Sequence, residues 1–366
     1  MACVRRLGHG CALAAGAVVL GLACGRVGAQ VQFSAPVIVG NLPGDPITEA
    51  SGLGASRRNP GVLWTHNDSG DSARVFAIDT LGRVLGTYTL PGVIAIDFED
   101  LCVGPGTAPG VSYVYVGDIG DNAAVRPVIY VHRFPEPSVS LGQWANPVTQ
   151  GVTGRETMTL VYPDGPRDAE GLAVDPWTGD LYVFSKQAGT MRVYTLAAAA
   201  FVSGTQATLT FVRAYPLSLA TAADISADGT LIIAKNLTSG VLWPRTPGQT
   251  IGDAMGVQGQ AVPVMNTQTE PRGEAIAFAH NGSGYYGVGE RVQAPLWLAR
   301  RVGWCDGDFN ADGNVDQDDI ACLAQAVAGD WSCLGAGIDA DFNRDGNVDQ
   351  DDVAALTQVV GGAGCP

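Results

Sequence analysis

The sequence predicts an all-β fold, a five-bladed β-propeller, between residues 31 and 303. This region is rich in Gly and Pro and contains many short apolar runs bounded by turn residues, a pattern typical of β-sheet proteins. A motif of one acidic residue and a short strand of small and apolar residues recurs at intervals of 50, 71, 54 and 50 residues. Its copies begin at Glu49, Glu99, Glu170, Asp224 and Glu274. Repeats of this length, with several strands each, indicate propeller blades.

Each copy is followed by a second predicted strand and most copies by a third. The second strands are expected at 62–66, 113–117, 181–185, 231–235 and 285–289, and third strands at 75–78, 128–134, 191–196 and 296–300. The last repeat lacks a fourth strand, which segment 34–39 can supply, and the ring then closes without an open sheet edge. The longest interval leaves six blades as the alternative, although 135–155 is predicted to be an insertion loop.

A second domain with two calcium loops is predicted from residue 305 to 366. One twelve-residue pattern starts at Asp308 and again, 33 residues later, at Asp341. Oxygen-bearing side chains recur at the positions that bind calcium in an EF-hand loop, and a Gly stands at the sharp turn. The predicted ligands are Asp308, Asn310, Asp312, Asn314, Asp316, Asp319, Asp341, Asn343, Asp345, Asn347, Asp349 and Asp352. A helical apolar period after each loop predicts one helix per loop.

This duplicated loop and helix, with no full entering helix, resembles a type I dockerin. The Asp at the last position of each loop, Asp319 and Asp352, is similar to dockerins as well. The resemblance implies a module that binds two Ca²⁺ ions and docks into a cohesin-like or other extracellular anchoring protein through 305–366. Dockerins often carry small hydroxyl residues at the positions that determine which partner they bind. This chain has Gln317-Asp318 and Gln350-Asp351 there, which departs from the pattern for a standard cohesin partner.

Four cysteines in this domain and its Gly-Cys-Pro ending resemble a cysteine-containing dockerin variety. Three connectivities are possible for two disulfides among four cysteines. We favour Cys305–Cys365, which closes the ends of the module, together with Cys322–Cys333. In the propeller, Cys102 lies in an apolar strand and is expected to be a buried thiol.

The first 29 residues are typical of a secretory signal peptide. Arg5 and Arg6 precede an apolar run at 11–24, and Val27-Gly28-Ala29 is a small-residue cleavage site. The run is too short for a membrane span, and lipid attachment at Cys24 is the weaker alternative. We therefore expect a secreted, extracellular protein that its docking domain can hold at a cell surface.

Charge and hydropathy exclude two other classes of partner. The tail contains thirteen Asp and a single Arg, so it carries most of the net charge of −15. No basic run occurs, which argues against nucleic-acid binding. No later segment is long and apolar enough to span a membrane.

Polar residues are predicted to gather at one face of the propeller. The start of the first strand and the end of the second share a face because these strands are antiparallel. The candidate ligand-binding residues are His66, Asp68, Asp71, Asp118, Asp121, Asn122, Glu170, Lys186, Lys235 and Arg291. Further acids of the same face are Glu49, Glu99, Asp100, Asp168, Asp224 and Glu274. Alternatively, each recurring acid accepts backbone N–H groups from the neighbouring blade.

Two functions fit such a face. It can bind a glycan or protein, or it can hold a further cation and hydrolyse a phosphoester, lactone or other ester. The chain lacks the Gly-x-Ser-x-Gly and His-Glu-x-x-His motifs, so whether it is an enzyme stays open. The segments 97–100 and 168–172 resemble phytase-like and gluconolactonase-like propellers, which implies a fold rather than an activity. Trp64, Trp243 and Trp297 are expected in the core.

Overall fold

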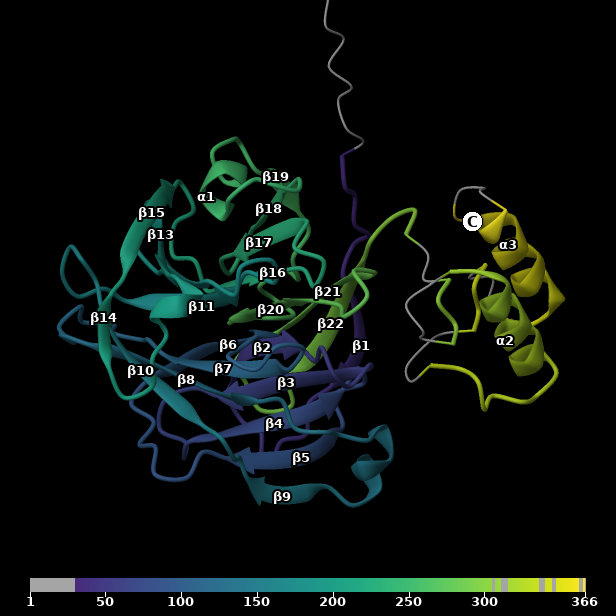
Figure 1. Ribbon diagram of the computed structural model, residues 1–366, viewed down its shortest axis with the longest axis horizontal. Helices are drawn as coiled ribbons and strands as arrows, with labels where there is room; N and C mark the ends of the chain where they lie inside the picture. The colour runs from purple at the N-terminus through teal and green to yellow at the C-terminus, as the bar shows by residue number, and fades with distance from the viewer. Residues whose placement is uncertain are drawn as a thin grey trace, which may run out of the picture. The chain divides into compact units, whose positions relative to one another are not determined.

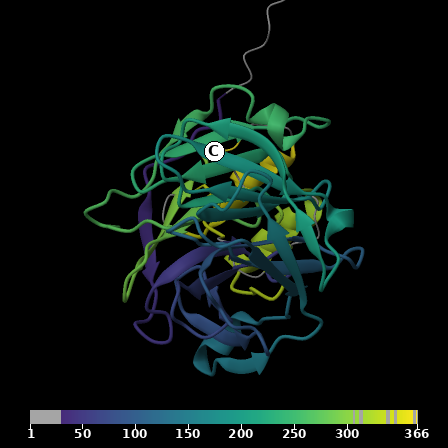
Figure 2. The same cartoon turned by 90° about the vertical axis from the view of Figure 1, so that its left-hand side faces the viewer.

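The computed structural model describes residues 30–304, 307–310, 315–335, 340–343, 347–361 and 365. The described residues form five sheets arranged as propeller blades (Figure 1). Figure 2 shows the chain turned by 90°, a view in which strands of several blades overlap. Blade 1 contains β2 (Ala50–Ala55), β3 (Val62–Asn67), β4 (Arg74–Asp79) and β5 (Val84–Thr89). Blade 2 contains β6 (Phe98–Pro105), β7 (Ser112–Asp118), β8 (Ile129–Pro135) and β10 (Glu156–Val161). Blade 3 contains β11 (Ala169–Val174), β12 (Leu181–Ser185), β13 (Met191–Leu196) and β15 (Thr210–Tyr215). Blade 4 contains β16 (Ala222–Ile225), β17 (Leu231–Lys235), β18 (Gly240–Pro244) and β19 (Gln260–Val262). Blade 5 contains β20 (Ala275–Phe278), β21 (Gly284–Val288), β22 (Pro295–Arg300) and β1 (Val37–Asn41).

The ring closes as the sequence predicts. The first strands β2, β6, β11, β16 and β20 contact one another in that order, and β20 contacts β2. Strand β1 pairs antiparallel with β22, with Val37 opposite Leu298. The N-terminal strand of the propeller therefore completes blade 5, whose other three strands are the last in the sequence. It begins at Val37, three residues after the predicted start at residue 34, and Phe33 forms only an isolated bridge with Arg301. The prediction of five blades is confirmed.

The longest repeat interval contains an insertion and no sixth blade. Between β8 and β10 the chain forms the 3₁₀ helix η1 (Leu141–Ala145) and β9 (Val148–Gly151). Strand β9 pairs in parallel with β5 and becomes a fifth strand of blade 1. Strand β14 (Gln206–Thr208) extends blade 2 in the same way, by pairing in parallel with β10. The remaining short helices are η2 (Ala198–Ala200) and α1 (Ile251–Ala254).

Small residues allow the first strands to approach one another around the channel. A Cβ atom on Gly52 of β2 would lie 2.6 Å from the backbone nitrogen of Leu101 in β6, and one on Gly171 would lie 3.2 Å from that of Ala223. Large side chains fill the space between blades instead. Trp64, Trp243 and Trp297 are fully buried, as predicted, and Cys102 is a buried free thiol.

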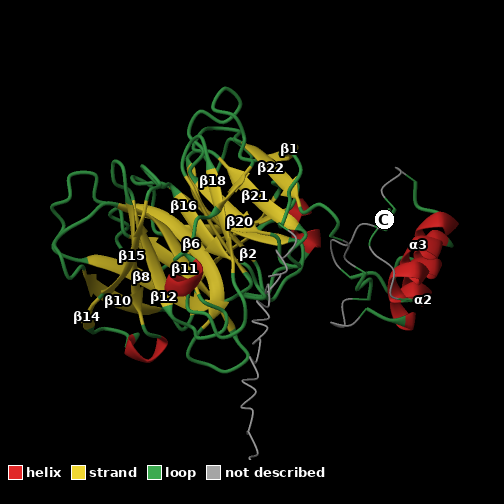
Figure 3. Cartoon of the chain, turned by 90° about the horizontal axis from the view of Figure 1, so that it is seen from above, coloured by secondary structure: helices red, strands yellow, loops and turns green. Residues whose placement is uncertain are grey.

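The C-terminal segment contains two helices, α2 (Gln317–Val327) and α3 (Gln350–Val360), which pack against each other (Figure 3). Each begins with the same capping box, formed by Asp316 and Asp319 in α2 and by Asp349 and Asp352 in α3. Leu323 and Leu356 are fully buried together with the rings of Phe309 and Phe342, whose centroids lie 5.6 Å apart. The predicted helix after each loop is therefore present.

The predicted disulfide Cys322–Cys333 is confirmed, with Cα atoms 5.6 Å apart. Cys365 is also disulfide-bonded, but its predicted partner Cys305 lies outside the described residues. Also outside them are the predicted signal peptide 1–29 and three of the predicted calcium ligands, Asp312, Asn314 and Asp345. In the described part of the chain, no helix is long and apolar enough to cross a membrane.

Candidate functional site at the propeller mouth

The mouth is the face of the propeller where the first strands begin and the second strands end. Strand register brings these ends together in each blade, for example Phe98 opposite Asp118 and Ala222 opposite Lys235. The loops that follow the second strands and those that lead into the first strands therefore surround one opening, as predicted.

Five carboxylates from three blades form a cluster at this mouth, which we call the carboxylate cluster: Asp68, Asp97, Glu99, Asp168 and Glu170. One oxygen from each of Asp68, Asp97 and Glu99 lies within 4.8 Å of the other two. The same holds for Glu99, Asp168 and Glu170, so Glu99 belongs to both groups of three. Asp68 follows β3, Asp97 and Glu99 lie at the start of β6, and Asp168 and Glu170 lie at the start of β11.

Glu99, which belongs to both groups of three, is almost completely buried. Its side chain accepts no hydrogen bond from the described residues, although the residue is only 5% exposed. Burial, and then the charges of Glu170 and the neighbouring acids, raise its pKa to about 11. Gly120 lies directly against it, since a Cβ atom there would fall 2.2 Å from Glu99 Oε1. The β7–β8 loop thus covers Glu99 without offering it a donor.

The other cluster members are only partly compensated. Lys186 donates to Glu170 Oε1, whereas Glu170 Oε2 is buried without a hydrogen-bond partner. Burial and the charge of Glu274 raise the pKa of Glu170 to about 9. Burial and the charge of Asp68 raise that of Asp97 to about 6. The mouth therefore concentrates more negative charge than its neighbouring cations offset.

Three of the sequence-predicted acids hold loops in place rather than joining the cluster. Asp71 accepts from Arg74 Nε at 2.8 Å and from Asn67 Nδ2 at 2.7 Å. Asp118 pairs with Arg126 at 2.7 Å. Asp121 accepts the backbone N–H groups of residues 125 and 126, at 2.9 and 2.7 Å. These carboxylates are already satisfied by donors of their own loops.

The remaining predicted residues lie around the cluster in different environments. His66 is fully buried, donates from Nδ1 to the Asn67 carbonyl at 2.8 Å, and has a pKa lowered by burial. Lys235 is also fully buried, donates to the Gly273 carbonyl and lies 3.8 Å from Glu270. The other predicted residues at the rim are Asn122, Arg291 and Glu49, which are exposed, and Glu274, which is half-buried.

Two acids at the starts of first strands, the motif acid Asp224 and Asp100, which follows the motif acid Glu99, link neighbouring blades. Asp100 Oδ2 accepts the N–H of Leu172 in β11, and Asp224 Oδ2 accepts the N–H of Phe278 in β20, both at 2.8 Å. The bond of Asp224 is the interblade hydrogen bond that the alternative reading expects of the recurring acids, and Asp100 makes an equivalent bond one residue after its motif acid. Glu99 and Asp100 are adjacent in sequence, yet one lies in the cluster and the other joins two blades.

The loops around the mouth present aliphatic side chains to solvent. We call this set the aliphatic rim, and its members, with exposed fractions of 85, 52, 69, 49 and 59%, are Ile94, Ile96, Val125, Leu219 and Val292. Three described non-glycine residues have positive φ, and all belong to these loops: Ala124 at 50°, Leu219 at 54° and Gln293 at 56°. Backbone strain of this kind, about 1–3 kcal/mol per residue, concentrates at ligand clamps and active sites. Sequence reasoning missed this rim because single aliphatic loop residues carry no pattern.

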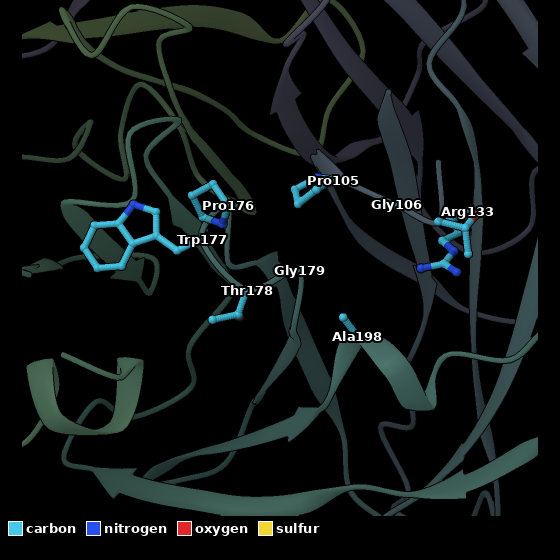
Figure 4. A pocket seen from close by; sticks show the side chains of 9 residues that line it. Pro105, Gly106, Arg133, Pro176, Trp177, Thr178, Gly179 and Ala198 are labelled. Carbon is cyan, nitrogen blue, oxygen red and sulfur yellow. The ribbon is translucent and has the colours of Figure 1, made fainter. Parts of the chain in front are cut away.

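A separate pocket of about 190 Å³ lies at the opposite face, between the β6–β7 and β11–β12 turns (Figure 4). Its walls include Pro105, Pro176 and Trp177. Arg133, its charged lining residue, is already bonded to Glu156 at 2.6 Å and to the Tyr115 hydroxyl at 3.2 Å. The unsatisfied charge of the propeller thus lies at the mouth and not in this pocket.

Comparisons with known proteins assign no family. No protein-family model matches the chain, and no curated protein matches it. A chain in the crystal structure of the nidogen/laminin complex is similar with a TM-score of 0.38 and 12% identity, over 67% of this chain and 73% of that one. A chain in the crystal structure of the mitotic checkpoint complex gives a TM-score of 0.32 and 15% identity, over 67% and 60%. The five-bladed architecture rests on the sheet topology of the chain itself.

Proposed function

We propose that this chain is an extracellular binding protein, whose propeller recognises a protein ligand at its mouth and whose C-terminal domain tethers it to an anchoring protein. The observation that carries the binding function is the aliphatic rim. Exposed apolar side chains gathered around one opening mark interaction sites, because covering each of them gains about 25 cal/mol per Å² of apolar surface.

The chemistry of the rim favours a protein over a glycan. Sugar rings are commonly bound by stacking on an aromatic ring, and none of the described mouth loops presents an exposed Phe, Tyr or Trp. Aliphatic residues such as Ile94 and Val125 instead suit apolar side chains of a protein surface. The strained backbone at Ala124, Leu219 and Gln293 holds these loops in set positions before the ligand arrives, which lowers the entropy cost of binding.

The tethering role of the tail is supported by the repetition of its loop geometry. Asp319 is fully buried and accepts the N–H groups of Asn310 at 3.1 Å and Asp316 at 2.8 Å. Asp352 makes the same two bonds one repeat later, at 2.9 and 2.8 Å. The positions expected to read a docking partner, 317–318 and 350–351, are exposed. We expect one Ca²⁺ ion in each loop and a cohesin-like or other anchoring protein as the partner.

The binding function is tested by placing a charge on the rim. Extracellular proteins would be passed over the immobilised full-length chain, its Val125→Asp variant and a control, Val202→Asp, whose residue is 53% exposed outside the mouth loops. We expect a protein retained by the parent and the control and lost from Val125→Asp, together with no signal on a glycan array. Glycan binding that Val125→Asp abolishes would instead identify a sugar ligand.

The second candidate function is metal-assisted hydrolysis of a phosphoester, lactone or other ester. It is favoured by the carboxylate cluster, where a bound cation would acidify a water molecule. Chelator-sensitive turnover of generic phosphoesters or lactones, lost in Asp97→Asn, would support this function over binding alone.

A further inference from the structure

We propose that the carboxylate cluster is a calcium-class site with two adjacent cation positions that share Glu99. The first position would be held by Asp68, Asp97 and Glu99, and the second by Glu99, Asp168 and Glu170. This inference goes beyond the binding function, since it depends on the cluster and not on the aliphatic rim.

The geometry of the two groups suits ions of this size. Calcium binds oxygens at about 2.3–2.6 Å, so two ligands on opposite sides of one ion lie up to about 5 Å apart. The oxygens of each group lie within 4.8 Å of one another, and each group can therefore close on one ion without a backbone movement. Glu99 has two carboxylate oxygens and can contribute one to each position.

A second observation separates this cluster from an ordinary acidic surface. Glu99 is 5% exposed, and the hydrogen bonds of the described residues include none to its carboxylate. Glu170 Oε2 is also buried without a partner. A buried carboxylate without a donor is costly unless a cation or a proton compensates it. Asp118 and Asp121, at the end of β7 and in the loop that follows it, receive Arg126 and backbone N–H groups and need no ion.

The nearest protein cations leave the cluster undercompensated. Lys186 pairs with Glu170, and Arg126 pairs with Asp118, which lies outside the cluster. Among the described residues, no ion pair is formed by Asp68, Asp97, Glu99 or Asp168. These four carboxylates lack a cation partner in the protein, although Asp168 Oδ1 accepts the N–H of Asp121 at 2.8 Å and Asp68 Oδ1 accepts that of Ser69 at 2.5 Å.

The donor set selects the chemical class of the cation. All donors are carboxylate oxygens, which suit the hard cations calcium, magnesium and manganese rather than zinc or copper. Calcium fits best because it accepts six to eight ligands in irregular geometry, whereas magnesium demands a tight octahedron. Asp68 is half-buried, so the first position faces the opening and leaves room for water or ligand oxygens.

The experiment counts ions bound by the full-length chain. Asp319→Asn and Asp352→Asn are introduced first, so that ions of the C-terminal loops do not contribute. Each protein is dialysed to equilibrium against buffered calcium, and the bound ions are counted by mass spectrometry of the digested sample. We expect two ions in this background, none after Glu99→Gln, and one after Asp68→Asn. Glu49→Gln removes an exposed acid of the same face and should leave both ions.

Circular dichroism establishes that each variant is folded. Should Glu99→Gln fail to fold, Asp68→Asn and Asp168→Asn carry the test, since each is expected to lose one ion. A background protein that binds no calcium, or a folded Glu99→Gln that keeps both ions, would overturn the proposal. Val125→Asp should retain two ions whatever it does to protein binding, so the cation site and the binding function can fail separately.

Discussion

Replacing Asp100 by Ala should destabilise the propeller without removing a cation. The carboxylate of Asp100 is 1% exposed and accepts two backbone N–H groups at 2.8 Å, from Leu101 in its own strand and from Leu172 in blade 3. The Ala variant leaves both N–H groups buried without an acceptor. The bond to Leu172 also joins the first strands of two blades, so its loss loosens the ring around the channel.

The expected loss of stability follows from these two bonds. Each orphaned N–H costs about 1–3 kcal/mol. Removing a buried carboxyl, whose pKa is raised well above its usual value by burial, offsets part of that cost. We expect a net loss of about 2–4 kcal/mol. With an unfolding entropy of about 2 cal/mol/K per residue over roughly 270 residues, this lowers the melting temperature by about 4–7 °C.

The measurement is calorimetric unfolding in saturating calcium, so that the cation occupancy of the tail and of the mouth is the same for every variant. Asp224→Ala is the matched variant, because Asp224 makes the equivalent bonds to Ile225 and Phe278 in blades 4 and 5. Both variants should lose similar stability and bind as many ions as the parent. Shifts below about 1 °C in both would show that these bonds do not hold the blades together.

Three further predictions concern the cluster, the core and the tail. In chelator, stability should fall as the pH rises from 5 to 8, by at most about 1.4 kcal/mol per pH unit for each retained proton. The reason is that folded Glu99 and Glu170, with pKa values raised to about 11 and about 9, keep protons that the unfolded chain has already lost. Calcium should reduce this dependence of stability on pH. A melting temperature that rises with pH in chelator would contradict the prediction. Trp64→Phe should cost about 1–3 kcal/mol more in urea unfolding than Trp243→Phe, because Trp64 Nε1 donates to Glu136 at 2.9 Å whereas the equally buried Trp243 Nε1 has no partner. Equal losses of stability in the two variants would show that the hydrogen bond from Trp64 to Glu136 contributes no measurable stability. Cys322→Ser with Cys333→Ser should destabilise the tail by about 2–3 kcal/mol, measured by hydrogen exchange of α2 and α3, and leave the propeller amides unchanged.

The blade architecture could be predicted from the sequence because its signals are local and repeated. Turn residues bound each strand, and the acidic motif recurs once per blade, so the second strands at 181–185 and 231–235 were placed to the residue. The pairing of β9 with β5 could not be predicted in this way. Parallel pairing at the outer edge of a blade follows from where the insertion returns, and no local pattern records that path.

The candidate site could be predicted only in part. Glu99, Asp168 and Glu170 stand at strand starts, so the motif placed them at the mouth. Sequence could not separate Asp68, which joins the cluster, from Asp118 and Asp121, because that depends on which loop N–H groups and arginines reach each carboxylate. Neighbouring strand residues point to opposite faces, and a bulge between Phe98 and Asp100 adds to this, so adjacent acids of one motif acquired different roles.

The most direct test of cation binding at the mouth is a crystal structure of the protein grown with manganese, in which anomalous scattering locates the ions. Two peaks are predicted, each about 2.1–2.6 Å from an oxygen of Glu99, one beside Asp68 and Asp97 and the other beside Asp168 and Glu170. Glu99 found without a peak, sharing a proton with Glu170 instead, would contradict a cation site at the mouth.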